Sequence, residues 1–89
     1  MIRGLEVFCA VIEAGGVTAA SGRLGMSQPA VSQQIAKLED HFRLTLFVRE
    51  HGRMRATETA LTLYEEATQA LDGMERVLSL ARDIHGLDR

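Results

Sequence analysis

The sequence predicts a mainly α fold: a winged helix-turn-helix, with three helices and a two-stranded wing, followed by a long linker helix for dimerisation. A short helix, a turn at Gly25 and a second helix are predicted within residues 18–42. A basic hairpin pattern covers residues 44–56, and an apolar repeat every seven residues covers residues 58–85. The single proline and the aromatic content of 4% argue against a β-sandwich.

Two short helices are predicted before residue 26. The first ends at the Gly15-Gly16 pair, and the second runs from Thr18, as its N-cap, to about Leu24. Gly25 ends the second helix because glycine adopts the left-handed conformation of helix C-caps. The apolar residues that define the first helix are Ile2, Leu5, Phe8, Cys9 and Ile12.

The third helix is predicted to be amphipathic and to continue to about residue 42. Ser27 is a favourable N-cap, and Pro29 in the first turn lacks an N–H group that would be unpaired there anyway. One apolar stripe is formed by residues spaced four, three and four apart, namely Val31, Ile35, Leu38 and Phe42.

The opposite side of the third helix carries compact side chains. Pro29, Gln33 and Ala36 lie there, with Ser32 and Lys37 on the flanks. Such side chains let a helix approach base edges in the major groove, where glutamine makes a bidentate contact to adenine. The alternative is an ordinary amphipathic helix whose polar face contacts only solvent.

A basic hairpin is predicted to follow. Residues 44–49 form its first strand, residues 50–53 its turn and residues 54–56 its second strand. Arg49, Arg53 and Arg55 outnumber the single acidic residue of this segment, which suits a wing beside DNA phosphates. The alternative is a solvated surface hairpin.

A long helix is predicted from Glu58, capped by Thr57, to about His85. Its three apolar heptad positions make a stripe too wide for one helix to bury, so we expect one side to pack on its own domain and the other to meet a second copy. The alternative is a helix folded wholly onto its own domain. The predicted dimer interface comprises Leu63, Leu71, Met74, Leu78 and Ala81.

The net charge of −2 is unevenly distributed. Residues 1–57, the predicted DNA-binding domain, carry seven Lys and Arg against five Asp and Glu. Residues 58–89, the predicted linker helix, carry three Lys and Arg against seven Asp and Glu. Affinity for DNA depends on where the cations lie, so the acidic total does not exclude a DNA-binding protein.

The sequence predicts neither an enzyme nor a cofactor or metal site. The three histidines lie far apart, and neither a phosphate-binding glycine loop nor a nucleophile motif is present. Cys9 lies in an apolar helix pattern, which predicts a buried thiol in a reducing cytoplasm. Because no export signal or long apolar run is present, we expect a cytoplasmic protein without membrane contact.

Several motifs resemble the N-terminal domain of LysR-type transcriptional regulators, and the resemblance runs from about Leu5 to Ile84. The motifs are Leu5-Glu6-Val7-Phe8, Glu13-Ala14-Gly15, Thr18-Ala19-Ala20, Ser27-Gln28-Pro29-Ala30-Val31-Ser32-Gln33-Gln34-Ile35, Leu38-Glu39, Leu46-Phe47-Val48-Arg49 and Ala56-Thr57. Arg43 stands where the family usually has glycine, and Gly22 stands inside the second helix.

The resemblance implies sequence-specific binding of double-stranded DNA by a homodimer on a dyad site, and a higher oligomer in a full-length protein. It also implies that a small-molecule effector acts only through a C-terminal domain that is absent from this chain. A module used only for protein association is the competing hypothesis. The DNA contacts that the resemblance implies are Thr18, Gln28, Pro29, Ala30, Ser32, Gln33 and Lys37, with Arg49 and Arg53 on the wing.

Overall fold

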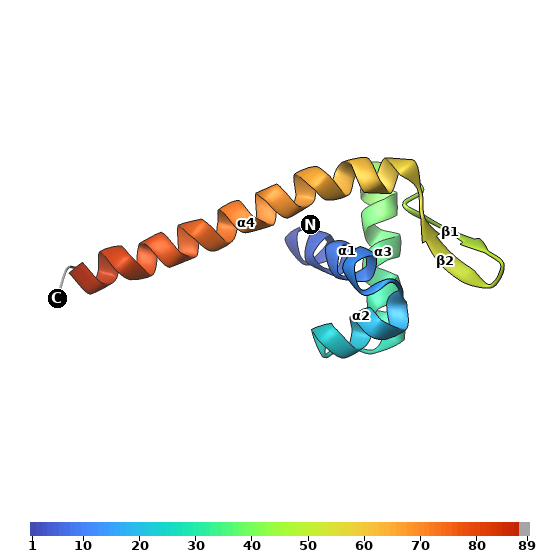
Figure 1. The fold of residues 1–89 in the computed structure, drawn as a ribbon, viewed down its shortest axis with the longest axis horizontal. Helices are drawn as coiled ribbons and strands as arrows, with labels where there is room; N and C mark the ends of the chain where they lie inside the picture. The colour runs from blue at the N-terminus through green and yellow to red at the C-terminus, as the bar shows by residue number, and fades with distance from the viewer. Residues whose placement is uncertain (88–89) are drawn as a thin grey trace.

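A computed structural model describes residues 1–87, which form four helices and one two-stranded antiparallel sheet (Figure 1). The three short helices make a compact body, the hairpin projects from it, and the last helix crosses the body and extends away from it (Figure 1). This architecture confirms the predicted winged helix-turn-helix with a long C-terminal helix. The elements are α1 (Ile2–Ala14), α2 (Val17–Leu24), α3 (Gln28–Phe42), β1 (Phe47–Glu50), β2 (Arg53–Ala56) and α4 (Glu58–Leu87).

The body encloses a small apolar core. Phe8 of α1 is fully buried and meets Phe47 edge-on, with ring centroids 5.9 Å apart. Gly4 allows α1 to lie close to α3, because a Cβ at this position would already touch Leu38 Cδ1 at 3.4 Å. The buried residues of α3 are Val31, Ile35 and Leu38, as its predicted stripe requires.

The helix ends follow the predictions with one exception. Gly15 and Gly25 end α1 and α2 in the left-handed conformation, and the Ser27 hydroxyl accepts the Ala30 N–H at 3.2 Å. The predicted N-cap at Thr18 is wrong. Because α2 begins at Val17, Thr18 already lies within its first turn, and no side chain caps this helix.

The hairpin is shorter at its start than predicted. Strand β1 begins at Phe47 rather than at residue 44, because the preceding peptide groups bond to Glu39 and Thr57 instead of a neighbouring strand. The turn contains only His51 and Gly52, both with positive φ, as a two-residue hairpin loop requires.

Helix α4 belongs to the body over only part of its length. Thr57 caps it as predicted, accepting the Ala60 N–H at 3.1 Å, and Ala60 and Ala67 are buried in the core. From Met74 onward its large apolar side chains are exposed, and the helix extends beyond the body (Figure 1). The alternative prediction, a helix folded wholly onto its own domain, is therefore wrong. No helix within residues 1–87 combines the length and the apolar character needed to cross a bilayer.

Candidate nucleic-acid interface

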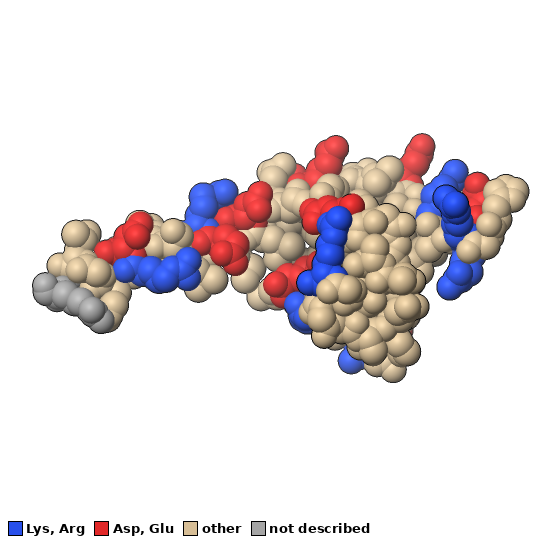
Figure 2. All heavy atoms as spheres, turned by 60° about the horizontal axis from the view of Figure 1, so that its bottom comes forward, with Lys and Arg blue, Asp and Glu red and all other residues tan. Residues whose placement is uncertain are grey.

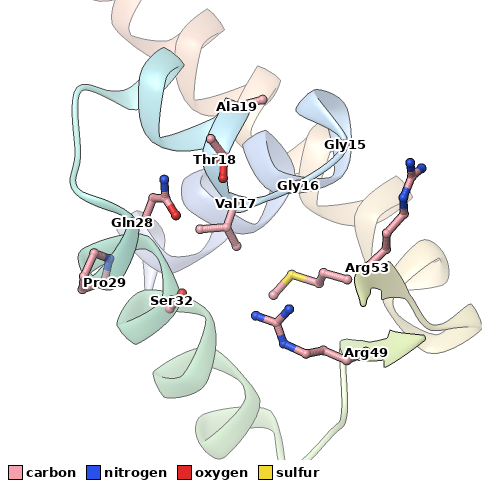
Figure 3. A pocket seen from close by; sticks show the side chains of 11 residues that line it. Gly15, Gly16, Val17, Thr18, Ala19, Gln28, Pro29, Ser32, Arg49 and Arg53 are labelled. Carbon is pink, nitrogen blue, oxygen red and sulfur yellow. The ribbon is translucent and has the colours of Figure 1, made fainter. Parts of the chain in front are cut away.

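A groove of about 1010 Å³ lies between α2, the beginning of α3 and the wing (Figure 3). We call it the wing groove. Among the residues that line it, two carry a positive charge and none carries a negative charge. Six of the nine DNA contacts expected from the sequence line this groove: Thr18, Gln28, Pro29, Ser32, Arg49 and Arg53.

The groove side of α3 is exposed and compact. Ser27 caps the helix and Pro29 lies in its first turn, while the buried stripe holds the opposite side against α1. Gln28, Pro29 and Ser32 are all exposed at the groove (Figure 3). Because these side chains are short and uncharged, the helix backbone can approach a planar polar ligand closely, as base reading in a DNA groove requires.

The N-terminus of α2 forms a second wall, which the sequence interpretation missed. Gly16 is its N-cap and provides no side chain to bind the N–H groups of the first turn. Residues 15–19 line the groove, so the positive end of this helix lies beside it. The signal in the sequence was the Gly15-Gly16 pair directly before a helical pattern.

The three arginines of the wing differ in whether they form an ion pair. Arg55 pairs with Glu50 at 3.5 Å, whereas Arg49 and Arg53 take part in no ion pair among residues 1–87. Arg49 points from the wing into the space facing α3, and Arg53 points in another direction (Figure 3). Blue side chains accordingly gather at the wing in Figure 2. Only two of the three wing arginines are thus free for an anionic ligand.

The remaining expected contacts lie outside the wing groove. Gln33 is exposed one turn beyond Pro29, and Ala30 is half-buried. Lys37 is exposed and lines a separate small hollow between α1 and α3, together with Gln34. These three positions continue the outer face of α3 rather than the wall that faces the wing.

A second groove, of about 440 Å³, lies between α1 and α4; we call it the linker groove. Leu71, Met74 and Leu78, three of the five predicted dimer residues, line it. Leu63 and Leu71 also pack against the core of their own chain, whereas Met74 and Leu78 are 40% and 50% exposed. Ala81 is exposed farther along α4.

Two titratable groups at the linker groove have raised pKa values: Cys9 lines the groove, and Tyr64 bonds to Glu13, which lines it. Burial raises the pKa of the Cys9 thiol to about 11, and the charges of Glu13 and Asp72 add to this shift. The Tyr64 hydroxyl donates a hydrogen bond to Glu13 Oε2 at 2.7 Å, which raises the pKa of Tyr64 to about 12. Cys9 is a buried free thiol with little thiolate at neutral pH, so it is chemically unreactive. Within residues 1–87, His, Cys, Asp and Glu form no group suited to holding a metal ion.

Comparison with known proteins identifies the fold and its relatives. Residues 2–61 match a family described as "Bacterial regulatory helix-turn-helix protein, lysR family". The chain is 39% identical over 83 residues to the transcriptional activator protein LysR of Escherichia coli (strain K12). That match covers 93% of this chain and 27% of the relative, so the chain spans about a quarter of that protein's length.

Two solved structures with DNA are closely similar. The BenM_DBD/catB site 1 DNA complex superposes with a TM-score of 0.91 at 27% identity, covering 100% of this chain and 96% of that one. The CbnR_DBD–DNA complex gives a TM-score of 0.86 at 32% identity, covering 94% and 97%.

Proposed function

We propose that this chain, which belongs to the lysR family of bacterial regulatory helix-turn-helix proteins, binds double-stranded DNA through the wing groove and regulates transcription. The observation that carries the proposal is the composition of this groove. It combines an exposed helix face of compact, uncharged side chains with two wing arginines outside any described ion pair, and without a carboxylate in its lining. A base-reading helix beside phosphate-binding cations needs this combination.

In this proposal the first turns of α3 enter the major groove. Gln28 and Gln33 offer an amide that donates and accepts at once, which suits adenine, and Ser32 adapts to either base edge. Pro29 and Ala30 supply apolar contact for a thymine methyl group. Both solved complexes named above contain DNA, which supports the same ligand for this fold.

Phosphates would be held around this helix. Arg49 and Arg53 lie on the wing, Thr18 lies in the first turn of α2 and Lys37 lies on the far flank of α3. The first-turn N–H groups of α2 are suited to donate hydrogen bonds to a phosphate oxygen beside Thr18. These contacts would position the protein without selecting a sequence.

We further propose that residues 58–89 join two copies while residues 1–57 bind DNA. Beyond residue 73, α4 exposes Val77, Leu78 and Ile84 at 66%, 50% and 51%, and water-exposed apolar surface of this extent favours association. A two-fold dimer would present two α3 helices to two half-sites. The proposed contacts are Leu63, Leu71, Met74, Leu78 and Ala81.

Selection of binding sites from a random pool of DNA duplexes, followed by affinity measurements over a salt series, tests this function. We expect an enriched half-site repeated with dyad symmetry, and an affinity that falls steeply as salt rises because phosphate contacts release counterions. A module used only for protein association would enrich no sequence and would show no such salt dependence.

A further inference from the structure

Glu39, near the C-terminal end of α3, has no part in the contacts proposed so far. Its side chain is directed at the wing: Oε2 accepts the Leu46 N–H at 2.7 Å and the Phe47 N–H at 3.3 Å. A carboxylate near a helix C-terminus is unfavourable in the field of the helix dipole. A tertiary contact has to offset this unfavourable energy, and the two charge-assisted hydrogen bonds to the Leu46 and Phe47 N–H groups do so.

The segment that Glu39 binds is the base of the wing. Leu46 lies just before β1, and its side chain is fully buried. Its carbonyl oxygen accepts the Thr57 N–H at 2.9 Å, and the Thr57 hydroxyl donates to the Thr45 carbonyl at 2.8 Å. Peptide groups around Leu46 are thus bonded on one side to α3 and on the other to the residue that caps α4.

The rest of the wing is held mainly by Phe47, Met54 and Ala56, which are partly buried and pack against the core. None of the side chains in β1 or β2 is fully buried, and most of them are exposed. The two strands bond to each other, but this fixes only their mutual register. The two hydrogen bonds that Glu39 accepts therefore add a directional polar contact between α3 and the base of the hairpin, beside the apolar packing.

We propose that Glu39 is a positioning residue, which sets the wing so that Arg49 and Arg53 both line the wing groove. Arg49 lies only two residues beyond Phe47, whose N–H the carboxylate binds. A small rotation at this base displaces both guanidinium groups from the phosphates that they would hold. This inference rests on the proposed DNA binding.

Four variants test the role, and three of them form a double-mutant cycle with the wild type. Glu39→Ala removes both acceptors, and we expect it to weaken DNA binding about tenfold. Glu39→Gln keeps an amide oxygen that accepts both N–H groups, so it restores most of the affinity. In an Arg49→Ala/Arg53→Ala background, Glu39→Ala causes no further loss, because it acts through those arginines.

Asp40→Ala is the matched control for charge. Asp40 is the neighbouring exposed carboxylate, and it takes part in neither a hydrogen bond nor an ion pair of a described side chain. Removing a negative charge near DNA by itself strengthens binding or leaves it unchanged. Weaker binding by Glu39→Ala, with no weakening by Asp40→Ala, therefore reports the lost hydrogen bonds.

Amide hydrogen exchange of Leu46 and Phe47, measured without DNA, gives an independent measurement. We expect faster exchange in Glu39→Ala and near wild-type exchange in Glu39→Gln. Unchanged exchange, unchanged affinity, or an additive loss in the double-arginine background overturns the positioning role, even though wild type binds DNA. If the wild-type chain binds no duplex at low salt, the proposed function fails first, and the positioning role fails with it.

Discussion

The two grooves of this small protein are opposite in charge. The wing groove is lined by two arginines and no carboxylate, whereas the linker groove is lined by four carboxylates and no Lys or Arg. The floor of the linker groove is apolar, with Leu71, Met74 and Leu78 among its residues. In Figure 2, blue side chains gather at the wing, whereas red and blue side chains lie side by side along the protruding part of α4.

This contrast explains how a chain of net charge −2 can carry a surface for a polyanion. In the proposed function, repulsion by the linker groove would direct DNA away from α4, while the wing groove would offer the local positive potential on which affinity depends. An apolar floor with an acidic rim instead suits an apolar helix. The distribution of charge over the fold is therefore more informative than its sum.

The largest expected effect comes from a substitution that disrupts the proposed dimer contact at the linker groove. Leu78→Glu places an unpaired carboxylate in the proposed dimer contact, which costs about 3–5 kcal/mol for a buried charge and should give monomers. Light scattering measures the mass. Leu80→Glu is the control, because Leu80 is as exposed but lies on another face of α4. An unchanged mass for Leu78→Glu would reject the proposed interface.

The second prediction concerns the hydrogen bond between Tyr64 and Glu13, which lines the linker groove. Tyr64 is the only tyrosine, so the phenolate absorbance titrates it alone. Its hydrogen bond to Glu13 raises its pKa from 10.0 to about 12. At pH 11 only about a tenth of Tyr64 should be ionised, instead of about nine-tenths for an unperturbed group.

A control and a stability change accompany this titration. Glu13→Ala should lower the midpoint of Tyr64 toward 10, and a wild-type midpoint near 10 would contradict the contact.

Because the folded pKa values of Cys9 and Tyr64 are both raised, their contribution to stability is fully present below pH 9. It is lost as the pH rises through about 9 to 12, which denaturant titrations at alkaline pH would detect.

The next prediction tests base reading by α3. Gln33→Ala should relax the base preference at one position of each half-site, at a cost of about 1–3 kcal/mol for the preferred sequence. Gln34→Ala is the control, because Gln34 faces the hollow near α1. Equal affinities of Gln33→Ala and wild type for every sequence tested would exclude this residue from base reading.

Phosphate binding by the wing predicts a different pattern. Arg53→Ala should weaken binding to all sequences alike, and it should lower the salt slope by about one for each protomer. Arg55→Ala should change the slope less, since Arg55 is already paired with Glu50. Anisotropy titrations at several salt concentrations compare the two variants, and identical slopes for both would argue against the assignment.

The smallest effect concerns α2, one wall of the wing groove. Gly22→Ala should stabilise the fold by about 1 kcal/mol, because the site is helical and a Cβ there meets nothing within 4 Å. Gly25→Ala should destabilise it by about 1 kcal/mol or more, because Gly25 has a φ of +64°. Urea unfolding measures both, and the same sign for the two variants would contradict the helix end at Gly25.

Much of the fold was predictable because its signals are local. Apolar residues at helical spacing predicted all four helices, and glycines predicted the ends of α1 and α2. The errors arose where a residue's partner is not local. Thr18 has the chemistry of an N-cap, but α2 begins at Val17 with Gly16 as its N-cap, so Thr18 is the second residue of the helix. Residues 44–46 are apolar enough for a strand, yet their peptide groups bond to Glu39 and Thr57.

The sequence alone determined which face of each helix is apolar, where the positive and negative residues concentrate, and that α3 presents a compact face. Only the tertiary structure decided which charges meet: it pairs Arg55 with Glu50, places Arg49 and Arg53 in the lining of the wing groove, and directs Glu39 at the base of the wing. The physical reason is that periodicity encodes a side chain's direction on its own element. Its partner depends on how separate elements pack, which residue spacing does not record.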